Sequence, residues 1–393
     1  MTREVVIVGA ARTPVGDFLG SLKDIPAVEL GVTAAHAALK RAGVRPEQVE
    51  EVAAGMVCAA GTKGNPARQV QLKAGLAVEA PAATVNQLCS SGLRAVEVAS
   101  HQIMLGRAGV ALAVGMENMT RAPYLVLKAR QGCRMGDDSI KDSMLMDALI
   151  DAFHNYHMGV TAENLAEKYG ISRREQDELA LLSHRRAVAA IRAGRFAEEM
   201  VPVTVRERKK ETVVDTDEHP RADATLDKLG QLRPVFKDGG SVTAGNASGI
   251  NDGAAALVLM SREKAQQLGV KPLARILASA SAGVPPEIMG IGPAYAIPKA
   301  LRFAGLSLQD VDYFEINEAF AAQFLAVNRE LKLDLEKVNA NGSGISLGHP
   351  VGCTGARILV SLLYEMNRRD ATVGAASLCA GGGPGIAMVI ERM

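Results

Sequence analysis

The stretch that decides the fold is NQLCSSGLRAVEV, residues 86–98. An apolar extended run, residues 82–85, precedes it, and an apolar run with helical spacing, residues 93–105, overlaps its end. Cys89 therefore lies at a turn between a predicted strand and a predicted helix, where Gly92 permits close backbone approach. We expect the adjacent serines to cap the helix, and its dipole and free N–H groups to lower the pKa of the Cys89 thiol. This arrangement is typical of a nucleophile elbow built on cysteine.

A single cysteine is more often a small buried hydrophobe than a nucleophile, so the rest of the chain must decide between these interpretations. The chain has 393 residues, of which 48% are hydrophobic, 4% are aromatic and 39 are glycine, as in a closely packed α/β protein with room for two domains. Its 44 basic and 43 acidic residues give a net charge of +1, which argues against a general attraction to nucleic acid or membranes.

The cysteines give no sign of a disulfide framework or a zinc ribbon. There are five of them, an odd number, and none forms a CxxC pair. No cluster of His, Cys, Asp and Glu has the spacing of metal ligands, so we expect neither a metal nor a bound organic cofactor.

The amino-terminal sequence, MTREVVIVGAARTP, runs directly into a predicted strand. It lacks the cationic segment and long apolar stretch of a secretory signal, and no apolar run in the chain reaches the length of a membrane span. We therefore expect a cytoplasmic protein with neither a membrane nor a nucleic acid as its partner.

Predicted strands and helices alternate along the first part of the chain. The strands are expected at residues 5–10, 49–57 and 110–114, and the helices at residues 27–42, 67–74 and 93–105. This alternation favours a doubly wound α/β layer with a mostly parallel sheet.

The middle of the chain, residues 120–240, has a different pattern. It contains two predicted amphipathic helices, residues 163–169 and 174–192, and a polar stretch, residues 206–227. Such a long excursion between sheet elements indicates an inserted lobe that covers a site or makes contacts between subunits.

An internal repeat relates the two ends of the chain. At a nearly constant offset, three segments of the first part match three later ones: residues 42–49 match 304–311, 91–94 match 354–357, and 110–114 match 373–377. We infer two copies of one α/β unit packed together with the site between them. The predicted division is 1–119 for the start of the first half, 120–240 for the inserted loop domain, 241–270 for the completion of the first half, and 271–393 for the second half.

Three motifs of the second half fall at predicted strand ends or helix starts: EINEAFA at 315–321, NGSGISLGHPVG at 341–352, and CAGGGPG at 379–385. Ligands of open α/β sheets collect at the carboxyl ends of strands. The repeat therefore predicts that Cys89, Asn317, His349 and Cys379 meet at one site. Each alone is more often structural, but their conjunction favours a catalytic role.

Together the motifs NQLCSSG, NEAFA, GHPVGCTGAR and CAGGGPG resemble those of the thiolases, the acyl-CoA acetyltransferase family, over essentially the full chain. HMGVTAEN at 157–164 and TAGNASGINDGAAA at 243–256 belong to the same resemblance. The resemblance implies a five-layered αβαβα fold of two repeated α/β halves with an inserted loop domain. It also implies a homotetramer, a dimer of dimers, with residues 119–141 in the tetramer contact.

The activity that this resemblance implies is a reversible Claisen condensation of two acetyl-CoA molecules to acetoacetyl-CoA and CoA, by a ping-pong mechanism through an S-acetyl group on Cys89. His349 would take the Cys89 proton, and Cys379 would be the second acid and base. The backbone N–H groups of Cys89 and Gly381 would form one oxyanion hole, and His349 with a water held by Asn317 would form the other.

The resemblance also implies the binding site for coenzyme A thioesters, which enter as substrates. Ser248 matches the position that bonds the pantetheine chain, and Arg221 matches a residue at the nucleotide end. The positions expected to line the pocket are His157, Met158, Leu149, Phe236, Met289, Ala319 and Phe320. His157 is equally compatible with a structural role. The His-Met pair resembles the acetoacetyl-CoA subgroup, in which a filled pocket favours short acyl chains.

Three alternatives remain open at this point. The first is a 3-ketoacyl-CoA thiolase of fatty-acid β-oxidation with longer acyl chains, which relative rates on short and long substrates would distinguish. The second is a cysteine hydrolase using Cys89 and His349, which would release free acid from acetyl-CoA. The third is a binding or scaffold protein that binds CoA without turnover.

Overall fold

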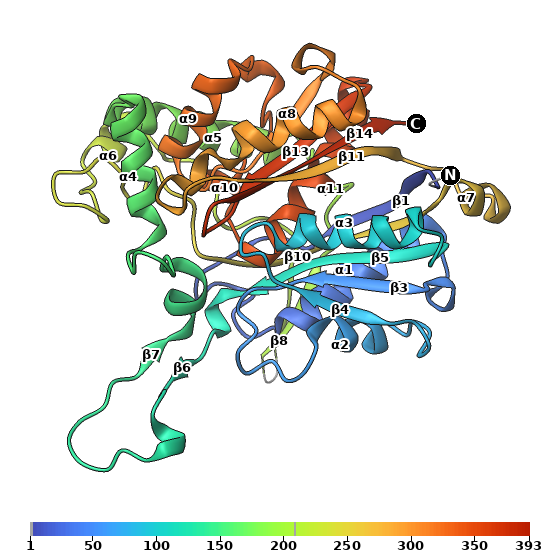
Figure 1. Cartoon of the computed structure of the whole chain (residues 1–393), viewed down its shortest axis with the longest axis horizontal. Helices are drawn as coiled ribbons and strands as arrows, with labels where there is room; N and C mark the ends of the chain where they lie inside the picture. Colours follow the sequence, from blue (N-terminus) through green and yellow to red (C-terminus); the bar gives the residue numbers. More distant parts are fainter. Residues whose placement is uncertain (1–2, 208–209) are drawn as a thin grey trace.

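The computed structural model describes residues 3–207 and 210–393. Two α/β halves lie side by side (Figure 1), and their strands join into one ten-stranded sheet. In chain order its strands are β1 (Val5–Arg12), β2 (Gly16–Asp17), β3 (Glu51–Gly55), β4 (Ala82–Val85), β5 (Val110–Asn118), β10 (Asn251–Ser261), β11 (Ala274–Gly283), β12 (Tyr313–Ile316), β13 (Val373–Cys379) and β14 (Pro384–Arg392).

The strand order shows how the halves are related. The main path of the sheet runs β12-β13-β14-β11-β1-β10-β5-β3-β4, and β2 pairs with β10. The first half therefore reads β1-β10-β5-β3-β4, and the second reads β11-β14-β13-β12 in the same sense. Only a short pairing, Val6 with Arg275 and Ile7 with Ala274, joins β1 to β11. The two halves thus have equivalent sheets that meet at one edge.

The expectation of a mostly parallel sheet is wrong. Parallel pairing occurs for β3 with β4, β3 with β5, and β12 with β13. The pairs β1–β10, β10–β5, β1–β11, β11–β14 and β13–β14 are antiparallel. Strands joined through a helix return in parallel, whereas β14 follows β13 after a tight turn and must run the opposite way.

Eleven helices are assigned within the described residues: α1 (Ala27–Ala42), α2 (Pro66–Lys73), α3 (Ser91–Met104), α4 (Met158–Tyr169), α5 (Arg173–Arg192), α6 (Leu226–Gly230), α7 (Arg262–Leu268), α8 (Gly292–Ala304), α9 (Ala321–Leu331), α10 (Gly344–Leu347) and α11 (Val351–Arg369). The predicted helix at residues 27–42 is confirmed, and the αL glycine Gly43 ends it. The helix predicted from residue 163 begins earlier, at Met158.

The large hydrophobic cores lie between helices and the sheet. One lies between α1, α2 and the first half's strands, and another lies between the second half's strands and the helices α8 and α9. The central core is formed by α3 and α11, which pack against each other between the two halves. Because α3 follows Cys89 and α11 follows His349, this central layer brings one motif of each half together.

The middle of the chain forms a lobe and a projecting arm (Figure 1). The lobe contains α4, α5 and α6, whereas the hairpin of β8 (Val203–Glu207) and β9 (Lys210–Val214) packs against the core of the first half. The arm extends from the body through β6 (Tyr124–Leu125) and β7 (Lys141–Asp142), and its tip projects away from the rest of the described chain. The predicted division into 1–119, 120–240, 241–270 and 271–393 stays a prediction. In the part of the chain that the structure describes, every helix is too short or too polar to cross a membrane.

Candidate active site

Cys89 lies in a strained turn directly before α3. Leu88, the preceding residue, has φ 48°, in the left-handed region that a branched side chain rarely adopts. Ser91 holds this conformation, because its Oγ accepts a hydrogen bond from Gln87 N at 2.8 Å and donates one to Leu88 O at 2.6 Å. The turn thus has the arrangement of a nucleophile elbow, with Cys89 at the position of the nucleophile.

The predicted capping of this helix by serine side chains is wrong. Ser90 is the N-cap residue of α3, but its side chain makes no capping hydrogen bond. Its backbone is already helical, at φ −79° and ψ −8°, whereas a capping residue normally has extended angles that aim its oxygen at the next N–H groups. The hydroxyl of Ser91 therefore stabilises the turn that precedes α3 and does not cap the helix.

The expected lowering of the thiol pKa is also wrong. Burial raises the pKa of Cys89 to about 11, although hydrogen bonds from the backbone N–H groups of Gly381 and Cys89 itself lower it in part. Removing the thiolate from water raises this pKa by more than the N–H groups at the helix end lower it. In the unliganded site Cys89 is therefore a neutral thiol that needs a base.

His349 is placed to be that base. It is 5% exposed and lines the same cavity as Cys89. Its backbone N–H donates to Asn251 Oδ1 at 2.9 Å, and its Nδ1 lies 2.6 Å from Thr354 Oγ1. Burial, with a smaller contribution from Arg357, lowers the pKa of His349 to about 3. The imidazole is therefore neutral and able to accept a proton.

The other predicted catalytic residues lie at the same place, buried behind the cavity wall. Asn317 Nδ2 is 3.5 Å from His349 Nε2. Burial raises the pKa of the Cys379 thiol, and the proximity of Cys89 raises it further. Gly381 directs its N–H at the Cys89 sulfur, and a Cβ atom at position 381 would clash with Met158 Cε, so a side chain there would force Met158 to move. The fold thus brings all five predicted catalytic residues together.

Glu117, which the sequence analysis missed, joins the two halves under this site. It ends β5 in the first half, and its buried carboxylate accepts three backbone hydrogen bonds, from Val57 N at 2.9 Å, Cys58 N at 3.0 Å and Gly352 N at 2.9 Å. Gly352 belongs to the first turn of α11, whose N-cap residue, Pro350, has no side-chain cap. The carboxylate of one half therefore caps the helix that follows His349 in the other.

Replacing Glu117 with alanine will destabilise the protein without touching the reactive groups. The change leaves three buried N–H groups without their acceptor, and we expect a loss of about 3 kcal/mol in the free energy of unfolding. Urea unfolding followed by circular dichroism measures it. Glu47→Ala, at an exposed glutamate, is the control and should change stability by less than about 0.5 kcal/mol. A loss below about 1 kcal/mol for Glu117→Ala would contradict this role.

A cavity of about 480 Å³ leads to Cys89 and His349. All nine residues predicted to bind the coenzyme A thioester line it: Ser248, Arg221, His157, Met158, Leu149, Phe236, Met289, Ala319 and Phe320. The cavity walls are mostly apolar, as expected for a site that holds a long flexible chain. The residues come from both halves and from the lobe, so the completed fold is needed to form it.

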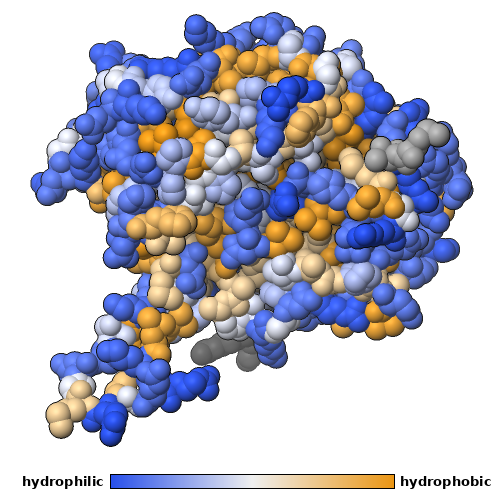
Figure 2. All heavy atoms as spheres, viewed as in Figure 1, coloured by the Kyte–Doolittle hydropathy of each residue, from blue (hydrophilic) through white to orange (hydrophobic). Residues whose placement is uncertain are grey.

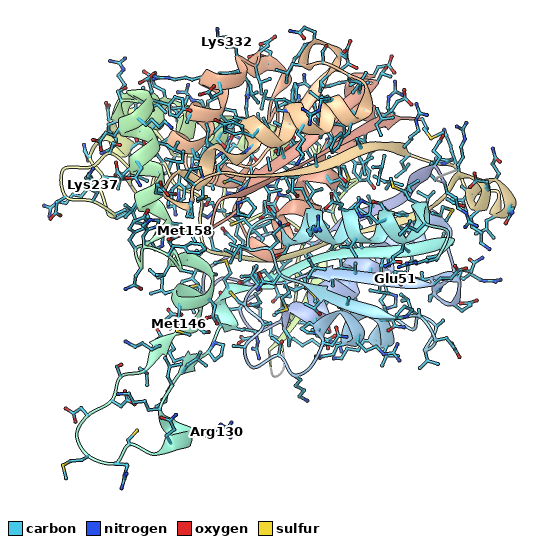
Figure 3. The ribbon with its side chains drawn as sticks, viewed as in Figure 1. Glu51, Arg130, Met146, Met158, Lys237 and Lys332 are labelled. Atoms are coloured by element: carbon cyan, nitrogen blue, oxygen red, sulfur yellow. The ribbon has the colours of Figure 1, made fainter. Side chains whose placement is uncertain are left out.

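The lobe contributes an aromatic wall of the cavity. The rings of His157 and Phe236 stack at 4.6 Å between centroids, and Phe320 meets Phe236 edge-on at 5.9 Å. His157 Nδ1 also accepts a hydrogen bond from Gly159 N at 3.0 Å and so caps α4. The two interpretations of His157 are therefore compatible, since it is a structural cap that also lines the cavity. Figure 3 shows Met158 where α4 meets the body of the molecule.

The remaining cavity residues include a polar contact that the sequence analysis did not find. Asp17 pairs with His219, and both line the cavity together with Arg221. The backbone N–H of Arg221 donates to His184 Nδ1 at 3.2 Å. Arg221 places positive charge at this part of the cavity, which suits the anionic nucleotide end of a coenzyme A molecule.

Comparison with known families agrees with this geometry. The model of the thiolase N-terminal domain matches residues 5–263, and that of the thiolase C-terminal domain matches residues 270–392. The chain belongs to the thiolase family. The fold expected from the sequence motifs is therefore that of this thiolase's own family.

Relatives of this thiolase match it from end to end. It is 55% identical to the acetyl-CoA acetyltransferase of Escherichia coli K12, over 100% of both chains, and 54% identical to that of Cupriavidus necator, over 99% of both. Among solved structures, the acetyl-CoA acetyltransferase of Syntrophomonas wolfei superposes with a TM-score of 0.99 at 49% identity, covering 100% of both chains. Human mitochondrial 3-ketoacyl-CoA thiolase gives 0.96 at 45% identity, covering 100% of this chain and 99% of that one.

Several functional residues of this thiolase could not be recognised from their surroundings in sequence. Asn251 and Thr354 stand inside quoted motifs, TAGNASGINDGAAA and GHPVGCTGAR, so the motifs marked their positions but not their contacts. Glu117 and Asp17 had no such signal, because their partners lie far along the chain. Among the residues described, no group of three or more His, Cys, Asp or Glu side chains is placed to hold a metal ion.

Proposed function

We propose that this thiolase is an acetyl-CoA C-acetyltransferase, which condenses two acetyl-CoA molecules to acetoacetyl-CoA and CoA and catalyses the reverse cleavage. The observation that carries the proposal is the meeting of Cys89, His349, Cys379 and the Gly381 N–H at the inner end of one apolar cavity. The names of the relatives from Escherichia coli and Cupriavidus necator support the same activity.

The first half-reaction transfers an acetyl group to Cys89. Its sulfur attacks the thioester carbonyl carbon while His349 Nε2 takes the thiol proton, and the N–H groups of Cys89 and Gly381 stabilise the tetrahedral oxyanion. The bond from the carbonyl carbon to the coenzyme A sulfur then breaks. Cys379 protonates the departing sulfur, so that CoA leaves as a thiol and Cys379 becomes a thiolate.

The second half-reaction forms the carbon–carbon bond. The Cys379 thiolate removes an α-proton from a second acetyl-CoA, and the enolate oxygen is stabilised by protonated His349 and a water held by Asn317. The enolate carbon attacks the acetyl carbonyl, and the carbonyl–sulfur bond to Cys89 breaks. The His349 proton returns to Cys89, which restores the free enzyme.

The acyl pocket favours a short chain. Met158 is 6% exposed, and its terminal methyl group packs against the loop that carries Gly381, where the acyl group would lie. The longer-chain alternative remains the second candidate, because human mitochondrial 3-ketoacyl-CoA thiolase has the same fold at 45% identity. Chain-length preference separates the two.

Thiolysis assays test both the activity and the chain length. With free CoA, we expect a higher kcat/KM on acetoacetyl-CoA than on 3-ketohexanoyl-CoA, and Met158→Ala should shift that ratio about 10-fold toward the longer substrate. Met146→Ala, at a methionine that is 39% exposed and labelled apart from Met158 in Figure 3, is the control. Faster wild-type turnover of the longer substrate would favour the second candidate. Release of free acid alone would indicate a hydrolase, and CoA binding without turnover would indicate a scaffold.

We further propose a cytoplasmic homotetramer, a dimer of dimers, that acts in fatty-acid metabolism without a metal or bound organic cofactor. The arm supports the tetramer, because it exposes apolar side chains that a single chain leaves in water (Figure 2). Their exposed fractions are Tyr124 63%, Leu127 61%, Met135 97% and Ile140 64%. Light scattering of the purified protein tests this, and a monomer would contradict it.

A further inference from the structure

The hydroxyl of Thr354 contacts one of the two ring nitrogens of His349. Thr354 Oγ1 lies 2.6 Å from His349 Nδ1 and 3.0 Å from Pro350 O. Thr354 is 0% exposed and His349 is 5% exposed, so bulk water does not compete for these contacts. Because a neutral imidazole carries its single hydrogen on either Nδ1 or Nε2, the contact at Nδ1 bears on which nitrogen is the base.

The two contacts of the hydroxyl assign that hydrogen. The hydroxyl has one hydrogen to donate, and the carbonyl of Pro350 can only accept. Both contacts are therefore hydrogen bonds only if Thr354 donates to Pro350 O and His349 Nδ1 donates to Thr354 Oγ1. In the other tautomer, with the hydrogen on Nε2, the hydroxyl could donate a hydrogen bond to only one of its two partners, His349 Nδ1 or Pro350 O. Nδ1 thus carries the hydrogen, and Nε2 keeps its lone pair.

The contact on the opposite side of the ring agrees with this assignment. Asn317 Nδ2 lies 3.5 Å from His349 Nε2. An amide N–H directed at an unprotonated Nε2 is attractive, whereas two N–H groups facing each other would repel. Nε2 therefore keeps a lone pair that can accept a proton.

The position of the Thr354 hydroxyl is rigid. Thr354 is in the first turns of α11, where its bond to the carbonyl four residues earlier selects one side-chain rotamer. The helix start is held by the bond from Gly352 N to Glu117, and a Cβ atom at Gly352 would clash with that carboxylate. The hydroxyl consequently cannot follow the imidazole if the ring turns, and it defines where Nδ1 must lie.

We propose that Thr354 is a positioning residue that holds His349 in the Nδ1–H tautomer, which leaves Nε2 free to take the proton of Cys89. The tautomer itself depends only on the contacts of His349, whereas its catalytic consequence rests on the function proposed above. The two can be tested separately.

Nitrogen-15 NMR of the histidine rings tests the tautomer directly. With labelled histidine in the intact protein, and His349→Asn to assign the signal, solid-state spectra at pH 7.5 should show His349 protonated at Nδ1 and unprotonated at Nε2. In Thr354→Val, which has the same shape without the hydroxyl, the Nε2–H form should appear. A wild-type His349 protonated at Nε2, or an unchanged tautomer in Thr354→Val, would overturn the proposal. If Thr354→Val does not fold, the wild-type spectrum alone decides.

Reactivity and turnover test the consequence. Thr354→Val should lower kcat of thiolysis by roughly 10- to 100-fold with little change in KM, because the hydroxyl affects the base and not binding. Carboxamidomethylation of Cys89 by iodoacetamide, followed by peptide mass spectrometry, should slow as well, and it requires no thiolase activity. Thr354→Ser should restore both rates to within about 3-fold, since it keeps the hydroxyl.

The matched control is Thr33→Val. Thr33 Oγ1 donates to Glu29 O at 2.9 Å, the same bond to a carbonyl four residues earlier, in the distant helix α1. The Thr33→Val variant should leave the tautomer of His349, the thiolysis rate and the rate of Cys89 carboxamidomethylation unchanged. Equal losses in Thr354→Val and Thr354→Ser, or a rise in KM with unchanged kcat, would refute the positioning role. A wild type without thiolase turnover but with the Nδ1–H tautomer would refute the proposed function and leave the assignment of the hydrogen intact.

Discussion

Cys89→Ala will lose thiolysis activity by roughly 10⁴-fold or more while it keeps its fold and its affinity for CoA. The physical reason is that no other described group combines a nucleophile, the two N–H donors of Cys89 and Gly381, and a base at His349. Loss of acetoacetyl-CoA absorbance in the presence of free CoA measures the activity, and calorimetric titration measures CoA binding.

Cys353→Ala is the control for this loss. Cys353 is a second buried cysteine, 1% exposed, four residues beyond His349, and its thiol packs in the central core. Because Cys353 is not among the residues that line the cavity and loses only its sulfur, we expect activity within about 3-fold of wild type. Substantial turnover by Cys89→Ala would show that the acyl group is held elsewhere, and the ping-pong mechanism would then fail.

Cys379→Ala will separate the two half-reactions. Because Cys379 is needed to remove the α-proton, we expect condensation and thiolysis to fall by roughly 10³-fold, while acetyl transfer from acetyl-CoA to Cys89 still occurs. Incubation with radiolabelled acetyl-CoA, followed by peptide mapping, should place the label on Cys89.

Measuring the amount of CoA that is released makes this experiment quantitative. The variant should release one equivalent of CoA per site and then stop, although more slowly than wild type, because Cys379 also protonates the departing CoA sulfur. The double variant with Cys89→Ala should give neither label nor CoA. A Cys379→Ala enzyme that condenses acetyl-CoA at the wild-type rate would reassign the second acid and base.

The sequence predicted those parts of the fold that depend on neighbours in the chain. The apolar spacing of residues 27–42 and the glycine that follows them gave α1 its observed bounds, because helical hydrogen bonds and the αL cap are local. The repeat between the two ends of the chain correctly indicated two equivalent halves. The motifs around Cys89, His349 and Cys379 identified the family, which comparison with known families then established.

The errors concern quantities that depend on distant segments. The direction of β10 relative to β1 and β5 depends on segments far apart in the chain, so a mostly parallel sheet was the wrong inference from alternation alone. The pKa of Cys89 was expected to fall, because a helix end can be recognised in the sequence, whereas the loss of water around the sulfur cannot.

The sequence by itself therefore determined which reactive groups this thiolase has, and that they stand at strand ends or helix starts. Only the tertiary structure decided how they act on one another. Glu117 reaches across to cap the helix of the other half, and Asn317 comes to within 3.5 Å of His349. The reason is physical: hydrogen-bond direction, desolvation and the choice of tautomer depend on atoms within a few ångströms in space, and here those atoms lie on chain segments that only the completed packing of the two halves brings together.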